Sequence, residues 1–162
     1  MMPPMTSARR FALRLVALGA FALMAACTPI SLGSDGPSVD ASQPIPVALL
    51  VPKGSSRQGD AAVAASLENA ARLAVADLSG VRIDLRVYGT GGNAGGANAA
   101  AVKAVNEGAK IIVGPLYAES ANAAGLAVAS QGVNVLAFSN NSAIAGGNVF
   151  FWATRLRTPQ PG

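Results

Sequence analysis

The fold follows from residues 107–140, which read EGAKIIVGPLYAESANAAGLAVASQGVNVLAFSN. Two short, mostly apolar runs are predicted to be strands: residues 110–113, predicted to be buried, and residues 133–138. Gly114-Pro115 ends the first run, and a helix is predicted over residues 119–130, with Gly132 just past its end. A strand, a helix and a second strand in this order predict two parallel strands in one sheet.

The same alternation extends toward the N-terminus. Residues 45–51, IPVALLV, form another apolar run, and Asp60 is predicted to cap a helix that reaches about residue 79 and is closed by Gly80. Glu68 and Arg72 form an i,i+4 pair on the polar side of this helix. Its apolar side is predicted from helical spacing to consist of Val63, Leu67, Ala70, Ala74 and Leu78.

The elements between and after these segments complete the pattern. Residues 81–88, VRIDLRVY, alternate strictly between apolar and polar, which predicts a strand with one wet face at a sheet edge. A glycine-rich segment, residues 89–96, precedes a helix over residues 97–107, and residues 149–152 are a candidate fifth strand. The fold class is therefore α/β: a three-layer parallel sheet with helices on both faces.

Polar loops are predicted at the carboxyl edge of this sheet, where ligands bind in open α/β sheets. They are residues 53–59, 115–120 and 139–148, and the helix after Gly114-Pro115 points its free N–H groups to the same edge. Each candidate has a structural alternative: loop chemistry for the Ser and Asn residues, a cap on the sheet edge for Tyr117 and a helix start for Ser120. The candidate ligand-binding residues are Tyr117, Ser120, Ser139, Asn140 and Asn141.

The composition excludes several classes of function. The chain has no histidine, which removes the usual general base near neutral pH and the usual metal ligand. Its one cysteine permits no internal disulfide and no thiolate metal cluster, and no acidic cluster suits calcium or magnesium. We therefore predict no catalytic residue, no metal site and no cofactor, so that the protein is not an enzyme.

The charges are divided unevenly along the chain. Of 12 Lys and Arg residues, Arg9, Arg10 and Arg14 precede Cys27, whereas all 8 Asp and Glu residues follow it. The part after Cys27 is therefore nearly neutral and lacks the clustered basic charge that nucleic-acid binding needs. No nucleic-acid partner is predicted.

Residues 1–26 have the pattern of an export signal. A basic start, residues 1–14, precedes an apolar run, residues 15–26, that is too short to span a bilayer. The run ends LMAAC, and the small residues before Cys27 resemble the lipobox of bacterial lipoproteins, in which the cysteine carries the lipid. An ordinary secretory signal with an incidental cysteine is the alternative. Residues 27–44, rich in Ser, Gly, Pro and Asp, are predicted to be a flexible tether.

Four segments together resemble one family: IPVALLVP (45–52), SLENAARLAVADL (66–78), EGAKIIVGPLYAES (107–120) and GVNVLAFSN (132–140). Their order is similar to the N-terminal lobe of type 1 periplasmic binding proteins of the leucine-binding-protein-like subgroup. The resemblance implies one lobe over residues 45–152, with ligand contacts from residues 116–120 and 139–142. Residues 153–162 do not look like the family's continuation, and we expect them to be an irregular tail at a truncated end.

Two functions are implied by this resemblance. The lipobox and the run VLAFSNNSAIAGGNVF (135–150) look most like lipoproteins that activate penicillin-binding proteins in peptidoglycan synthesis. Ala118 stands where amino-acid binders of the family commonly have a hydroxyl residue, which favours the activator. The alternative is the substrate-binding component of an ABC importer for amino acids or similar small polar ligands. Thr28, in place of the Asp that retains such lipoproteins at the inner membrane, implies a periplasmic location at the outer membrane of a Gram-negative cell.

Overall fold

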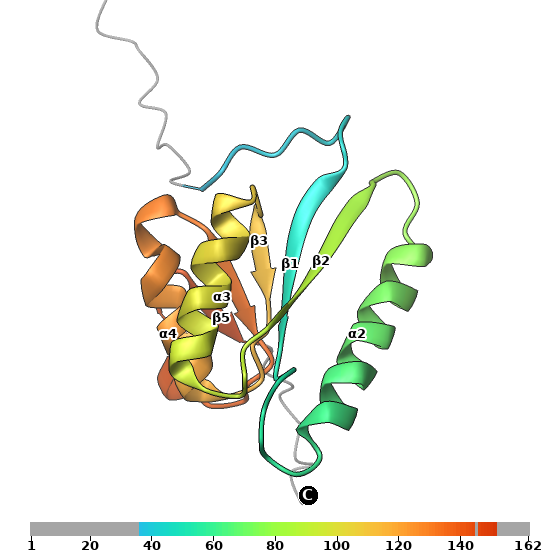
Figure 1. Cartoon of the computed structure of the whole chain (residues 1–162). Coiled ribbons are helices and arrows are strands. Elements are labelled where there is room, and N and C mark those ends of the chain that lie inside the picture. Colours follow the sequence, from blue (N-terminus) through green and yellow to red (C-terminus); the bar gives the residue numbers. More distant parts are fainter. Residues whose placement is uncertain (1–35, 145, 152–162) are drawn as a thin grey trace, which may run out of the picture. The chain divides into compact units, whose positions relative to one another are not determined.

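The computed structural model describes residues 36–144 and 146–151, which form one five-stranded parallel sheet with helices on both sides (Figure 1). The strand order is β2-β1-β3-β4-β5. The fold class predicted from the sequence is confirmed. In chain order the elements are β1 (Ile45–Val51), α2 (Asp60–Ala76), β2 (Ile83–Gly89), α3 (Ala94–Asn106), β3 (Ile111–Val113), α4 (Ala118–Val128), the 3-10 turn η2 (Ala129–Gln131), β4 (Asn134–Ala137), the 3-10 turn η3 (Ser142–Ile144) and β5 (Val149–Phe151).

Strand β1 lies inside the sheet, which explains why its sequence is apolar without alternation. Its side chains point alternately to the two faces, and each face has its own hydrophobic cluster. Ala48 and Leu50 pack with α3 and α4, whereas Leu49 and Val51 pack with α2. Figure 1 shows α2 on one side of the sheet and α3 and α4 on the other.

Small side chains allow α3 and α4 to lie close to the sheet and to each other. The buried residues of both helices are alanine, glycine and serine apart from Val128 at the end of α4. A Cβ atom on Gly125 would lie 2.1 Å from Cγ2 of Val149, so glycine is required where α4 crosses β5. The alanines of α3 and α4 that face the sheet therefore permit this close packing.

The other face of the sheet is covered unevenly. Helix α2 packs over β1 and β2 through Ala64, Leu67 and Ala71. On β4 and β5 the side chains of Leu136 and Phe150, which pair in register, are 41% and 48% exposed. Within the described ranges, the helical layer on this face therefore covers the β1–β2 half of the sheet.

All strands are parallel, but the side on which the chain adds its next strand to the sheet changes between β1 and β3. From β1 the chain crosses through α2 to β2 on one side, and from β3 it crosses through α4 to β4 on the other. At such a topological switch point the loops that follow the two strands run in opposite directions, and ligands of open α/β sheets commonly bind there. The loop after β1 (residues 52–59) and the loop after β3 (residues 114–117) flank this point.

Two helix starts and one helix face differ from the sequence prediction. Asp60 is the first residue of α2 and not its cap: Gly59, at φ 88°, occupies the cap position without a side-chain bond. The side of α2 that faces the sheet is shifted, so that Val63, Ala70, Ala74 and Leu78 are exposed. Helix α3 begins at Ala94, three residues early, because the side chain of Asn93 caps it by accepting a hydrogen bond from Gly96 N at 2.8 Å.

Several other local predictions are confirmed. Strand β2 is at an edge of the sheet, and β5 pairs in parallel with β4. The Glu68–Arg72 pair forms at 2.7 Å. Helix α2 ends at Ala76, slightly before the predicted end, and Gly132 adopts the left-handed conformation after η2.

The last residues of the predicted tether contact the amino edge of the sheet. Arg82 Nη2 donates to the carbonyl oxygen of Ser42 at 2.7 Å, and the Ser42 amide and hydroxyl both donate to Asp40 Oδ1. The predicted export signal, Cys27 and the tail at residues 153–162 lie outside the described residues. In the part of the chain that the structure describes, no helix is long and apolar enough to cross a membrane.

Candidate functional site

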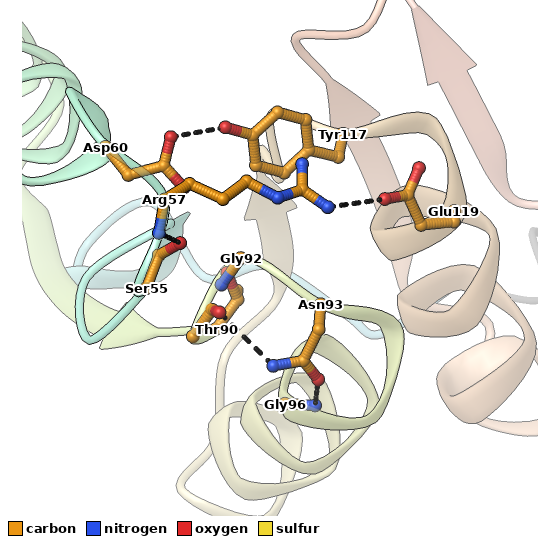
Figure 2. Close-up of polar contacts among 10 residues, drawn as sticks. Ser55, Arg57, Asp60, Thr90, Gly92, Asn93, Gly96, Tyr117 and Glu119 are labelled. Carbon is orange, nitrogen blue, oxygen red and sulfur yellow. Dashed lines mark hydrogen bonds and ion pairs between the residues drawn. The ribbon is translucent and has the colours of Figure 1, made fainter.

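A hydrogen bond across the topological switch point joins the loop after β1 to the loop after β3. The Tyr117 hydroxyl donates to Asp60 Oδ1 at 2.5 Å, and Asp60 is only 5% exposed (Figure 2). Tyr117 immediately precedes α4, and Asp60 is the first residue of α2. The bond therefore fixes the starts of two helices that lie on opposite faces of the sheet.

The loop after β2 closes against the same carboxylate. Gly92 has φ 67°, and a Cβ atom there would lie 2.6 Å from Ser55 Oγ and 3.0 Å from Asp60 Oδ2. Only glycine permits this approach together with this backbone conformation. Among the described residues, Asp60 Oδ2 is buried without a hydrogen-bond partner of good geometry. The neighbouring hydroxyls still act on the charge: those of Ser55 and Tyr117 lower the pKa of Asp60, and burial opposes them.

Arg57 reaches over this hydrogen bond toward α4. Its guanidinium carbon lies 4.4 Å from the centroid of the Tyr117 ring, and its Nη2 lies 3.5 Å from Glu119 Oε1, as Figure 2 shows. The side chains of Arg57 and Glu119 are 52% and 56% exposed, so that water and salt weaken the ion pair. Arg57 is thus held by a ring and a carboxylate, and can exchange either contact at low cost.

A groove of about 590 Å³ lies between the first turns of α4 and the loop after β4. The β4 loop is shaped by its own side chains: Ser139 Oγ accepts from Asn141 N, and Asn141 Oδ1 accepts from Ala143 N. Glu119 is the one charged side chain among the described residues that line the groove. The lining residues are Ala118, Glu119, Asn122, Asn141, Ala143, Ile144 and Gly146.

The five candidate ligand residues occupy different environments at this edge. Asn141 lines the groove, Asn140 is exposed, and Ser139 is 8% exposed. The Tyr117 hydroxyl is bound to Asp60, and Ser120 is fully buried with no partner for its Oγ within the described residues. A ligand could therefore reach Asn140 and Asn141 directly, and would meet Ser120 only after a rearrangement of α4. The assignment of these five residues to ligand binding stays a prediction.

Sequence reasoning missed the residues that give this edge its charge. The sequence predicts Asp60 as a helix cap, whereas its carboxylate accepts a hydrogen bond from Tyr117, 57 positions later in the chain. Glu119 and Asn122 line the groove one helical turn apart. Helical spacing alone would have placed Glu119 and Asn122 on one side of α4, but nothing in the sequence indicates that Arg57 reaches Glu119. Among the described residues, no three His, Cys, Asp or Glu side chains are grouped to hold a metal ion.

Comparison with known proteins places this geometry in a family. The family model described as periplasmic binding protein matches residues 44–159. The chain belongs to the periplasmic binding protein family. A search of curated protein sequences finds no match. The matched range begins one residue before β1 and includes every strand and helix described above.

Two solved structures share the fold at low sequence identity. The branched-chain amino acid transporter substrate-binding protein LivJ from Streptococcus pneumoniae str. Canada MDR_19A, in complex with isoleucine, has a TM-score of 0.59 and 18% identity over 67% of this chain. The leucine-, isoleucine-, valine-, threonine- and alanine-binding protein from Brucella ovis, in a closed conformation, has a TM-score of 0.51 and 21% identity over 67% of this chain. The matches cover 33% and 32% of those proteins, so this periplasmic binding protein chain spans about a third of their length.

Proposed function

We propose that this chain is the ligand-recognition lobe of an exported binding protein that takes a small polar ligand of the amino-acid class for an ABC importer. The observation that carries the proposal is the polar groove at the carboxyl edge of the sheet, next to the switch point. Asn122 and Asn141 supply amide groups there, and the start of α4 supplies free backbone N–H groups. Two of the solved structures that share this fold are amino-acid-binding proteins by name.

The groove offers one wall of a ligand site. Small-molecule sites usually bury 70–90% of the ligand surface, which an open groove on one lobe does not achieve. A dissociation constant of 1 mM corresponds to only about −4 kcal/mol, and a few polar contacts reach that value with difficulty after the entropy cost of association. We therefore expect this chain alone to bind amino acids no more tightly than about millimolar.

Calorimetry tests this proposal. Titration of the purified chain with leucine, isoleucine or valine at micromolar concentrations is expected to give no measurable heat of binding. The same titration on a form that carries a second lobe is expected to show binding that is tighter by orders of magnitude. Micromolar affinity in the chain alone would contradict the one-wall argument, and the absence of any amino-acid binding in the two-lobed form would contradict the importer function.

A second candidate function is that of a docking lipoprotein that activates a penicillin-binding protein. Three observations favour it: Ala118 lacks the hydroxyl expected of amino-acid binders, the Tyr117 hydroxyl is engaged by Asp60, and Ser120 is buried. These features remove hydroxyl groups from the side of the groove that α4 provides. A binding titration of the two-lobed form against a purified penicillin-binding protein tests this function, because an activator binds the synthase without an amino acid and a transport receptor does not.

Both candidates are non-catalytic and attached to a membrane. The absence of histidine from the sequence supports a binding role and not an enzymatic one. We place the lipid on Cys27, on the basis of the small residues that precede it, and the lobe in the periplasm at the end of the tether. Lipidation of Cys27 and ligand binding by the groove are independent properties, so each needs its own test.

A further inference from the structure

The charge of the groove points to the kind of chemical group that it accepts. Glu119 contributes a full negative charge in the first turn of α4. The free N–H groups of a helix start are equivalent to about half a positive charge, which is too little to cancel a carboxylate. The other lining side chains are uncharged. The groove by itself therefore favours a group with positive charge and N–H donors over a carboxylate.

Arg57 already occupies the carboxylate of Glu119, but weakly. One guanidinium nitrogen approaches one oxygen at 3.5 Å, and both side chains are more than half exposed. A bidentate arginine–carboxylate pair would be shorter and stronger. Arg57 has a second contact besides Glu119, because its guanidinium stacks on the Tyr117 ring. Asp60 fixes that ring by a hydrogen bond. The arginine can thus release Glu119 and keep its cation–π contact.

We propose that Glu119 recognises the ammonium group of an amine-bearing ligand, and that Arg57 is an exchangeable counter-ion that competes with the ligand for Glu119. Glu119 and Arg57 then set the charge specificity of the groove, with Asn122 and Asn141 as neighbouring polar contacts. The proposal rests on the proposed function, since it specifies which end of a small polar ligand meets α4. It assigns opposite roles to the two members of one ion pair, which makes it testable.

The test uses two probes that each carry one end of an amino acid. L-leucinamide has the ammonium group without the carboxylate, and N-acetyl-L-leucine has the carboxylate without the ammonium group. Each is titrated into the isotopically labelled chain at about pH 6, well below the ordinary pKa of an α-amino group. NMR signals of Ala118, Glu119 and the side-chain amides of Asn122 and Asn141 report binding. We expect saturable shifts with L-leucinamide and none with N-acetyl-L-leucine.

Two substitutions break the same ion pair and are expected to act in opposite directions. Glu119→Gln should weaken L-leucinamide binding about fivefold, as expected for the loss of one exposed charge contact. Arg57→Gln should strengthen it about twofold or more, because the competing cation is removed. Glu68→Gln and Arg72→Gln are matched controls, since Glu68 and Arg72 form an exposed ion pair on α2 away from the groove. Both controls should leave the affinity unchanged.

The outcomes separate this inference from the proposed function. Equal shifts with both probes, or a loss of L-leucinamide binding in both Glu119→Gln and Arg57→Gln, would overturn the ammonium assignment. A loss in both variants would mean that the ion pair only supports the structure. If neither probe nor L-leucine itself perturbs the groove at tens of millimolar, the proposed ligand function fails together with the inference. Binding of N-acetyl-L-leucine alone would keep the ligand function and reverse the charge assignment.

Discussion

Asp60 is the residue on which three loops converge. Its carboxylate accepts the Tyr117 hydroxyl, and its second oxygen faces Gly92. The hydroxyls of Ser55 and Tyr117 lower its pKa, and Asp60 in turn raises the pKa of Tyr117. Asp60 and the exposed Arg57–Glu119 ion pair both link the loops at the switch point, and of these Asp60 is the buried group. The protonation state of Asp60 should therefore affect how firmly the starts of α2 and α4 are joined.

Tyr117→Phe should raise the pKa of Asp60 toward its ordinary value, because one of the two hydroxyls that stabilise the carboxylate is removed. A group whose pKa is lowered by folding stabilises the protein above its unfolded pKa, and this contribution is lost as the pH falls through the folded-state pKa. The variant should therefore melt at a lower temperature than the wild type at neutral pH, and the difference should shrink below about pH 4. NMR titration of the carboxyl carbon of Asp60 and melting curves across pH measure both effects.

Tyr88→Phe is the matched control for this experiment. The Tyr88 hydroxyl donates to Glu107 Oε2 at 2.7 Å, away from Asp60. The pKa of Glu107 is lowered by its contact with Lys103 and, to a smaller extent, by this hydrogen bond. This variant should raise the pKa of Glu107 and leave that of Asp60 unchanged. A titration in which Tyr117→Phe leaves the Asp60 carboxyl shift curve in place would show that the hydrogen bond does not form in solution.

Cys27 is the residue that we propose as the lipid anchor. Cys27→Ser should release the chain from the membrane fraction, since a serine at this position cannot receive the thioether-linked lipid. Fractionation of cells that express the two forms, together with the intact mass of the processed chain, measures the outcome. If the serine variant remains with membranes after its N-terminus has been cleaved, the lipoprotein assignment is wrong, and the proposals on the groove are unaffected.

At the scale of single elements, the start of α3 shows how glycine positions a helix. Gly95 and Gly96 are adjacent in the first turn, but only Gly96 is close to backbone: a Cβ atom there would lie 2.0 Å from the carbonyl oxygen of Thr90. At Gly95 the nearest atom would be Asn93 Oδ1 at 3.5 Å, which is an ordinary contact. Packing therefore requires glycine at position 96 but leaves room for a Cβ atom at position 95.

Alanine at these two positions should change stability in opposite directions. Gly96→Ala forces the helix away from the β2 loop and should cost roughly 2–3 kcal/mol, as overpacking does. Gly95→Ala should stabilise the protein by about 0.5–1 kcal/mol, because alanine loses less backbone entropy in a helix. Urea denaturation of the two variants gives both free energies of unfolding. A Gly96→Ala variant as stable as the wild type would mean that α3 starts later than described.

Elements were predicted well from sequence where a local pattern determines them. Strand β1 is apolar because both faces are covered, and β2 alternates because it is at an edge. For α2, most residues of the predicted buried side lie one position before those that are buried. Alanine occurs on every side of this helix, so the spacing of apolar residues does not distinguish its buried side from its exposed side. The start of α3 was placed late, because two glycines disfavour a helix unless a cap such as Asn93 offsets them.

At the scale of the whole molecule, the sequence predicts at which edge of the sheet a candidate site lies, but not the contacts within that candidate site. The order of strands and helices implies a switch point, and hence an edge where ligands bind. The charged residues at that edge come from separate loops: Arg57 and Asp60 lie beside Tyr117 and Glu119 only because β1 and β3 are neighbours. Residue spacing in one sequence indicates which residues share a face of a helix or strand, but not which distant loops come into contact. It therefore does not predict the Arg57–Glu119 and Asp60–Tyr117 contacts.

The measurement that tests the central claim most directly is an NMR titration of the chain with isoleucine, mapped residue by residue. Saturable shifts are expected at the residues that line the groove, with an affinity of about millimolar or weaker. These residues are Ala118, Glu119, Asn122, Asn141, Ala143, Ile144 and Gly146. A second cavity at the amino edge of the sheet is the internal control and should not respond; it is lined by residues 38–40, residues 43–46 and Lys110. Shifts confined to the amino edge, or no shifts at tens of millimolar isoleucine, would contradict a ligand site at the carboxyl edge.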